Sequence, residues 1–107
     1  MLLLEIKSEI GEDLRIVDPT QEQNCQAVEE CCFVDKEKWI LLLRSDEDWV
    51  ESDGETGVQF RQGGSGVFVY EGPLDYTTIL GVFLSYARNE ETWKMDFQWS
   101  WEGRRLA

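Results

Sequence analysis

Residues 93–101 constrain the fold most strongly, because apolar and polar side chains alternate strictly along this stretch. The odd positions are large and apolar, and the even positions between them are polar. A period of two is typical of a β-strand with one buried and one solvated face. We therefore expect a strand here, inside an antiparallel sheet and with its aromatic face under helices. The apolar set consists of Trp93, Met95, Phe97, Trp99 and Trp101.

The length and apolar content of the chain predict one domain over residues 1–107. The chain has 107 residues, of which 42% are hydrophobic, enough for one core and too many for a disordered chain. No apolar run approaches the ~20 residues of a membrane span. The apolar segment that starts at Met1 ends at Glu5, so it is too short for a signal peptide, and it lacks the basic start of one. We therefore expect a cytoplasmic protein.

The first third of the chain predicts a β-hairpin followed by a helix. Strands are expected over residues 1–8 and 14–17, with a turn around Gly11. Asp18 is the expected N-cap of the helix, with Pro19 at its first position and Gln21 completing a capping box. Helical spacing of Cys25, Val28 and Cys32 carries this helix to about Cys32.

The remainder predicts a meander of short strands and a second helix. The apolar run over residues 39–43 suits a central strand that is covered on both faces. Shorter strands are expected over residues 49–51, 58–61 and 67–71. The second helix begins at the N-cap Asp75 and ends near Asn89, with Gly81 allowing close approach to the sheet. Its apolar stripe is Tyr76, Ile79, Leu80, Phe83, Leu84 and Ala87. Together these elements predict an α+β fold: a twisted antiparallel sheet of about five to six strands with two helices on one face.

Charge is the main functional indication in the sequence. Twenty-two acidic residues oppose ten basic ones, which gives a net charge of −12. Nucleic acids and anionic membranes are poor partners for such a chain, because phosphate groups would be repelled. A basic protein would instead be attracted, and its association accelerated. Acidity for solubility alone is the simpler alternative.

The residue inventory argues against an enzyme and against a metal site. Histidine is absent, which removes the commonest general base and metal ligand. Carboxylates are so numerous that pairs arise by chance, and none has a supporting constellation. Cys25, Cys31 and Cys32 fit neither a disulfide framework nor a zinc knuckle, and are expected to be small buried hydrophobes. We expect no cofactor.

Two polar motifs are each compatible with a functional role and with a simpler structural one. The glycine cluster at residues 63–66 lacks the lysine of a phosphate-binding loop and leads into a strand, so a hairpin turn is expected. The acidic stretch from Asp46 to Glu55 lacks the ligand spacing of a calcium loop. It surrounds Trp49, and an aromatic ring among carboxylates is a composition typical of binding hot spots. The alternative is that Trp49 belongs to the core and the acids form a solvated turn. The candidate partner-binding residues are Asp46, Glu47, Asp48, Trp49, Glu51, Asp53 and Glu55.

The aromatic side chains of residues 93–101 could either bind a ligand or form part of the core. They could form a stacking platform for sugars or bases, although the charge of the chain disfavours bases. The cleanly polar opposite face favours a core role instead. Trp101, at the end of the row, is the member expected to be partly exposed.

The C-terminal half resembles a family of small acidic bacterial proteins. The resemblance rests on residues 63–66 with 69–71, on Leu80 with residues 83–86, and on Trp93 with residues 97–99. It is to immunity proteins of polymorphic-toxin and contact-dependent inhibition systems, and it covers about residues 58–101. Such proteins bind and block a cognate toxin, often a nuclease, and the toxin usually supplies the basic surface. The Cys31-Cys32 pair and the short middle loops depart from the pattern, so the cognate toxin stays open.

The sequence as a whole thus predicts a non-enzymatic binding protein of the immunity or inhibitor type. It would cover a basic partner, such as a toxin nuclease, with the acidic surface near residues 46–55. The alternative is a structural or homo-oligomeric module, in which the aromatic strand pairs with a second copy. A small-molecule binder would need an apolar pocket, which a sequence does not reveal. A monomer and a homodimer are both compatible with these expectations.

Overall fold

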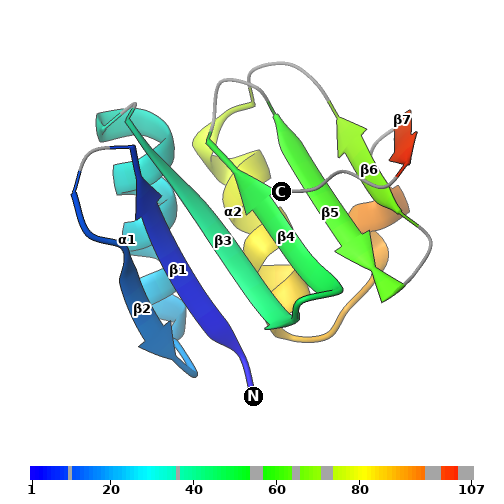
Figure 1. The fold of residues 1–107 in the computed structure, drawn as a ribbon, viewed down its shortest axis with the longest axis horizontal. Helices are drawn as coiled ribbons and strands as arrows, with labels where there is room; N and C mark the ends of the chain where they lie inside the picture. Colours follow the sequence, from blue (N-terminus) through cyan, green and yellow to red (C-terminus); the bar gives the residue numbers. More distant parts are fainter. Residues whose placement is uncertain are drawn as a thin grey trace.

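The computed structural model describes residues 1–9, 11–35, 37–53, 57–63, 66–70, 74–95 and 100–103. They form one antiparallel sheet in the order β2-β1-β3-β4-β5-β6-β7 (Figure 1). Six strands, β1 to β6, form the body of the sheet, and the short β7 is added at one edge. The strands are β1 (Leu3–Ser8), β2 (Leu14–Val17), β3 (Lys38–Ser45), β4 (Asp48–Ser52), β5 (Val58–Gln62), β6 (Val67–Tyr70) and β7 (Ser100–Gly103).

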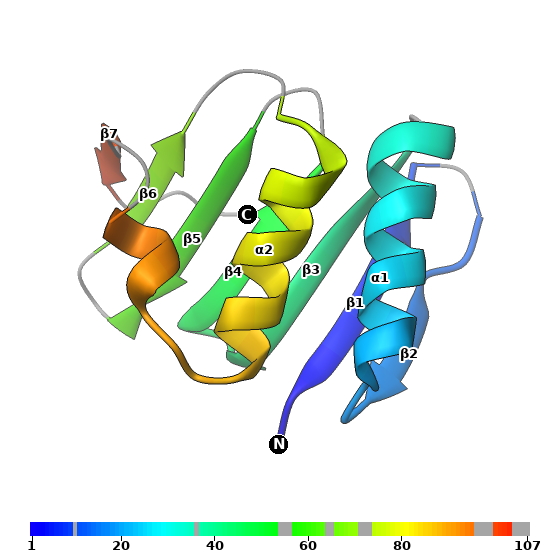
Figure 2. The same ribbon diagram turned by 180° about the vertical axis from the view of Figure 1, so that it is seen from behind.

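Both long helices lie on the same face of the sheet, as Figure 2 shows. Helix α1 (Gln21–Glu29) packs beside α2 (Tyr76–Ala87), and the two run in opposite directions. The main core fills the space between these helices and the sheet, with Leu4, Ile40, Phe83 and Tyr86 among its buried members. The predicted α+β class and the one-sided placement of the helices are therefore confirmed.

The start of α1 differs from the prediction by two residues. Thr20, and not Asp18, is the N-cap. Its side chain accepts a hydrogen bond from the Gln23 backbone amide, and the Gln23 side chain accepts one from the Thr20 backbone amide. Asp18 has a positive φ of 49°, and its carboxylate accepts a hydrogen bond from the amide of Leu2, the residue just before β1. The capping box between Thr20 and Gln23 therefore sets the start of the helix, and Asp18 stabilises the turn between β2 and α1.

Helix α1 also continues beyond its expected end. A π-helical turn, η1 (Glu30–Val34), follows it directly and ends where the Asp35 amide donates to the Glu30 carbonyl at 2.8 Å. Cys31 and Cys32 face the core from this turn. The wider turn lets both adjacent cysteines be buried, which a regular α-helix does less easily because neighbours are 100° apart.

Helix α2 begins as predicted, and the Asp75 side chain accepts from the Thr78 amide at 2.8 Å. The fully buried stripe includes Val82 and Tyr86 besides Ile79 and Phe83. At the C-terminal end, Asn89 has a positive φ of 61°, as is common just after a helix. The expected role of Gly81 is wrong: it is exposed, and a Cβ there would meet nothing within 4 Å.

The prediction of a long terminal strand is also wrong for its first residues, 93–95. The chain over Thr92–Met95 forms a 3-10 turn, η3, and β7 pairs only with β6, at the edge of the sheet. The Trp93 indole donates to the Glu90 carbonyl at 2.9 Å and is buried against Phe60 and Tyr86. Helix α2 covers β3 and β4 and ends near their hairpin, and η3 extends the covering layer over β5 (Figure 2). Phe97, Trp99 and the Trp101 side chain lie outside the described residues, as do Glu55, Gly64, Ser65 and Glu71.

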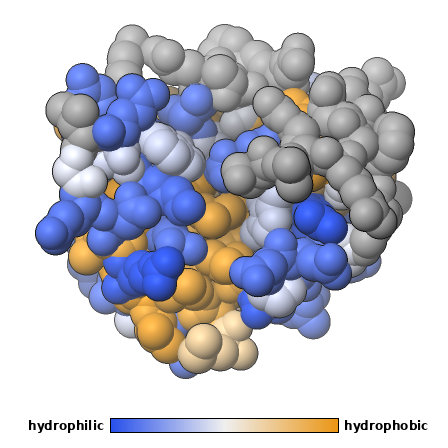
Figure 3. Space-filling view, in the orientation of Figure 1, coloured by the Kyte–Doolittle hydropathy of each residue, from blue (hydrophilic) through white to orange (hydrophobic). Residues whose placement is uncertain are grey.

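Strand β3 is central, as predicted, but only one of its faces is fully covered. Ile40 and Leu42 are buried under the helices, whereas Leu41 and Leu43 on the other face are half-buried. We call this second side of the sheet the open face. Figure 3 looks onto it and shows apolar residues gathered between hydrophilic ones.

Candidate protein-binding surface

The tip of the β3–β4 hairpin holds the first two of the predicted partner-binding residues. Asp46 and Glu47 are both exposed in this turn. Glu47 pairs with Arg61 of β5 at 3.3 Å, and its backbone carbonyl accepts from the Gly63 amide. Part of the negative charge at this tip is therefore compensated within the chain.

The alternation of β4 separates the next three candidates. Asp48 lies on the helix-covered face, while Trp49 and Glu51 lie on the open face. Glu51 accepts a hydrogen bond from the Gln59 side chain at 2.7 Å. Asp53 is half-buried at the far end of the strand, and Glu55 lies outside the described residues. The described candidates therefore do not share one continuous surface.

Trp49 is a core residue of the open face. It is 7% exposed and packs with Val67 and Val69, with Leu41 and Leu43 beside them. An indole this covered offers little area to a partner, so the structure places Trp49 where the core interpretation expected it.

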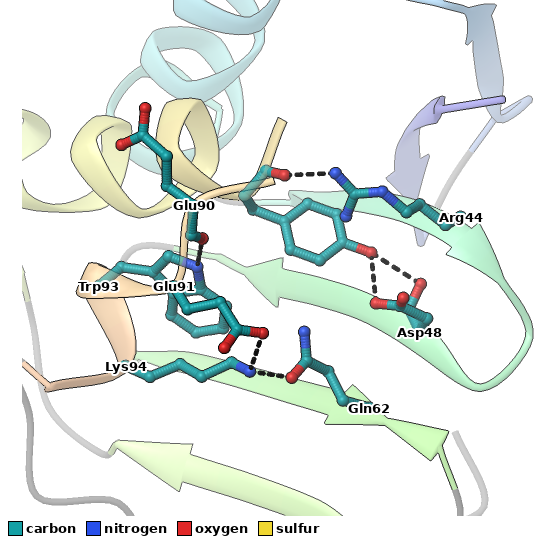
Figure 4. Close-up of polar contacts among 8 residues, drawn as sticks. Arg44, Asp48, Gln62, Glu90, Glu91, Trp93 and Lys94 are labelled. Atoms are coloured by element: carbon teal, nitrogen blue, oxygen red, sulfur yellow. Dashed lines mark hydrogen bonds and ion pairs between the residues drawn. The ribbon is translucent and has the colours of Figure 1, made fainter. Parts of the chain in front are cut away.

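Asp48 holds a buried tyrosine at the end of the core. The Tyr86 hydroxyl lies 2.8 Å from the Asp48 carboxylate, to which it can donate, and the Tyr86 ring is 2% exposed. Arg44 donates to the Tyr86 carbonyl at 2.6 Å, with its guanidinium 4.3 Å from the ring centroid (Figure 4). Burial, assisted by Asp48, raises the pKa of Tyr86 far above its ordinary value. This arrangement keeps the phenol neutral and locked, which suits a structural role.

Lys94, Gln62 and Glu91 form a second cluster of polar side chains at the same end of the core, beside Asp48. Lys94 of η3 donates to the Gln62 side chain and pairs with Glu91 at 3.1 Å (Figure 4). Its ammonium also lies within 6 Å of the Phe60 and Trp93 ring centroids, at 5.8 and 5.7 Å. The sequence offered no sign of this group, because Lys94 was expected on the polar face of a strand.

The opposite end of the molecule carries the denser negative charge. The pairing of Ser8 with Lys38, and of Ile40 with Ser52, brings the ends of β1 and β4 beside the start of β3. The C-terminal end of α1 and the N-terminal end of α2 lie at this same end (Figure 2). We call this region the acidic end. Its described acids are Glu9, Glu12, Asp13, Glu29, Glu30, Asp35, Glu37, Asp53 and Asp75.

Few described cations oppose these acids. Lys7 lies near the end of β1, and Lys38 starts β3. The Lys38 ammonium is 2.9 Å from Glu30 and 3.7 Å from Asp35, and its hydrogen bond with Glu30 raises its pKa. The acidic end therefore retains a large excess of exposed carboxylates among the described residues, without relying on the 46–55 stretch.

Two apolar side chains are exposed within this acidic end. Phe33 is 43% exposed and Val34 is 71% exposed, both on η1. The Phe33 ring meets Tyr76 of α2 edge to face, with 5.9 Å between centroids. Sequence reasoning missed this pair because it ended the helix at Cys32. The available signal was the pair of apolar residues directly after the cysteines and before Asp35.

The neighbouring cysteines, Cys31 and Cys32, are buried. Burial raises the pKa of Cys31 to about 12 and that of Cys32 to about 11, so both thiols are protonated at neutral pH. No group of three potential ligands is placed to hold a metal ion within the part of the chain that the structure describes. The cysteines instead anchor η1 to the core.

Neutralising the acidic end is expected to stabilise the fold. The double change Glu29→Gln and Glu37→Gln removes two exposed charges from a crowded region, one of them near a helix C-terminus. We expect the free energy of unfolding to rise by about 0.5–1 kcal/mol, since each unfavourable charge costs a few tenths. Thermal unfolding at low salt measures this rise.

The control is a pair of equal charge at the other end, Asp46→Asn with Glu90→Gln. Arg44, Arg61 and Lys94 lie in that region, so a smaller gain or a loss is expected. Equal stabilisation by the two pairs would contradict the proposed crowding of charge.

Within the described residues, the helices are too short or too polar to cross a membrane. Comparison of the chain with family models, curated proteins and solved structures found no match. The resemblance to immunity proteins therefore stays a prediction from the sequence.

Proposed function

We propose that this chain is a non-enzymatic binding protein that neutralises a basic protein partner. It would act in the cytoplasm as an inhibitor of the immunity type, and a toxin nuclease is a fitting partner. The observation that carries the proposal is the excess of exposed carboxylates at the acidic end, where the two described lysines oppose acids from five separate stretches of the chain.

Electrostatic attraction supports this function. A face of one charge sign accelerates encounter with an oppositely charged protein and disfavours partners of like charge. Crowded carboxylates also repel one another and lower the stability of the fold. A surface that is costly to maintain is consistent with a role in recognition.

The chemistry of the buried groups favours binding over catalysis. Cys31, Cys32 and Tyr86 are the described groups whose pKa is raised most, and burial is the first cause in each. All three are neutral near pH 7, and the raised pKa values move them further from the range in which a nucleophile or general base operates.

Affinity capture tests the proposal directly. The wild-type chain, immobilised and exposed to an extract of its native host, should retain a basic protein that a moderate salt gradient releases. The purified chain should then inhibit the activity of the captured protein. The Glu29→Gln and Glu37→Gln variant should release it at lower salt than the Asp46→Asn and Glu90→Gln variant. Retention of no basic protein, or of one whose activity is unaffected, would contradict the proposed function.

Self-association is a second candidate, favoured by the open face. Val17 is 58% exposed at the edge of that face, and Leu3, Leu41 and Leu43 are half-buried beside it. A pair of chains could cover this apolar area (Figure 3). Light scattering separates the candidates, because a dimer has twice the monomer mass of 12.5 kDa.

A further inference from the structure

We infer that the π-helical turn η1 is the contact point for the basic partner, with Phe33 and Val34 as its apolar anchor. The complementary surface would be an apolar recess bordered by lysine and arginine side chains. This inference rests on the proposed function and specifies where and how the partner is held.

Phe33 and Val34 are apolar side chains that η1 exposes to solvent. Val34 is 71% exposed and Phe33 43% exposed, although both lie directly after two fully or nearly buried residues. Exposed apolar side chains that adjoin each other lose unfavourable contact with water when a partner covers them. Phe33 is already oriented by Tyr76, so its ring would bind with little loss of freedom.

The charge around the pair selects the partner. The Glu30 and Asp35 side chains, 50% and 39% exposed, lie on either side of Phe33 and Val34 in the chain. Glu29, Glu37 and Asp75 add further exposed carboxylates at the same end. Binding interfaces commonly combine an apolar centre with a charged, solvated border. A negative border of this kind favours lysine and arginine on the facing surface.

Backbone hydrogen bonds and buried side chains hold η1 in place. The Asp35 amide closes the turn on the Glu30 carbonyl at 2.8 Å, and the Lys38 amide donates to the Asp35 carbonyl at 3.2 Å. Cys31 and Cys32 hold the inner side of the turn in the core. Such π-helical turns occur frequently at functional sites. A surface fixed in this way binds at a smaller entropic cost than a mobile loop.

The open face is less suited to a cationic partner. Arg15 pairs in register with Glu5, and Arg61 with Trp49, so both arginines lie on the same side as the apolar residues there. Lys7 lies on this side too, opposite Trp39. Arg15 and Arg61 offset carboxylates there, with Glu5 at 3.1 Å and Glu47 at 3.3 Å, so this side attracts lysine and arginine less than the acidic end does.

Two synthetic peptides of equal charge provide the test. One carries leucines on a single face of a lysine- and arginine-rich helix, and the other has serines in place of those leucines. We expect the wild-type chain to bind the leucine peptide roughly tenfold more tightly at low salt, with the largest amide NMR shifts over Glu30–Val34.

The variants Val34→Ser and Val17→Ser form a matched pair, because both valines are exposed, at 71% and 58%. Val34→Ser should reduce the preference for the leucine peptide about tenfold, whereas Val17→Ser should preserve it. Phe33→Ala should reduce it as well, and thermal unfolding of each variant verifies that it is folded.

The outcomes separate this inference from the proposed function. Equal, salt-sensitive binding of both peptides by the wild-type chain would retain a cationic partner and overturn the apolar anchor. Equal effects of Val34→Ser and Val17→Ser, or shifts centred on the open face, would overturn it too. If neither peptide bound at low salt, the proposed function itself would be wrong.

Discussion

Charge reversal at Asp48 is expected to destabilise the fold by about 2–3 kcal/mol. The Asp48→Lys change removes the carboxylate acceptor of the buried Tyr86 hydroxyl, which leaves it only the Asp48 backbone carbonyl, also at 2.8 Å, and places an ammonium group near the Arg44 guanidinium. Both effects act in a half-buried setting, where the loss of a charged hydrogen-bond partner and the repulsion of like charges cost more than at the surface. For a domain of this size the melting temperature should fall by roughly 10–20 °C. Thermal or urea unfolding measures the change.

Matched variants identify the cause. Glu51→Lys makes the same charge reversal two residues along β4, on the open face, and should cost about 1 kcal/mol or less. Asp48→Asn keeps an oxygen that can accept from Tyr86, so it should lie between wild type and Asp48→Lys. If Asp48→Lys were as stable as Glu51→Lys, the tyrosine contact would contribute little to stability.

Asp48 is a poor position for testing partner binding by mutation. Asp48 belongs to the acidic stretch that the sequence predicted as the partner surface, yet it supports the core through Tyr86. Loss of binding by Asp48→Lys would therefore report unfolding as well as contact. The exposed Glu29 and Glu37 are better positions for testing recognition, because their removal should stabilise the fold.

Alkaline pH is expected to reduce stability steeply, because buried thiols must ionise when the chain unfolds. The pKa of Cys31 rises to about 12 and that of Cys32 to about 11 in the folded protein, from an ordinary value of 9.0. Above pH 9 the unfolded chain therefore binds fewer protons than the folded one, and the free energy of unfolding falls as pH rises. The contribution is about 1.4 kcal/mol per pH unit for each thiol, or about 5 kcal/mol in total by pH 11. Burial shifts the pKa of Tyr86 in the same direction.

Urea unfolding at several pH values between 8 and 11 tests this linkage. In the Cys31→Ala and Cys32→Ala double variant, the decline with pH should be shallower, even though its stability at pH 8 is lower. Cys25→Ala controls for the loss of a half-buried thiol. An unchanged slope in the double variant would contradict ionisation of Cys31 and Cys32 as the cause.

Local patterns were sufficient for most of the secondary structure. The β1–β2 hairpin, the central β3 and the Asp75 cap of α2 were all predicted, because each depends on residues close together in the chain. The strand predicted over residues 93–101 is wrong for residues 93–95, which form η3, whereas residues 100 and 101 lie in β7 and residues 96–99 are outside the described part of the chain. Trp93 fills the end of the core from η3, against Phe60 and Tyr86, which lie far from it in sequence.

The sequence by itself determined the net charge, the lack of histidine, the α+β class and the order of its main elements. Only the tertiary structure decided which charges share a surface. Side chains adjacent in β4 point to opposite faces, so the acidic stretch around Trp49 is divided. Acids that are distant in the chain, such as Glu9, Glu37 and Asp75, are instead brought to one end by antiparallel pairing and helix direction. The exposure of Phe33 and Val34 likewise follows from burial of the two cysteines before them, a constraint set by packing against the sheet.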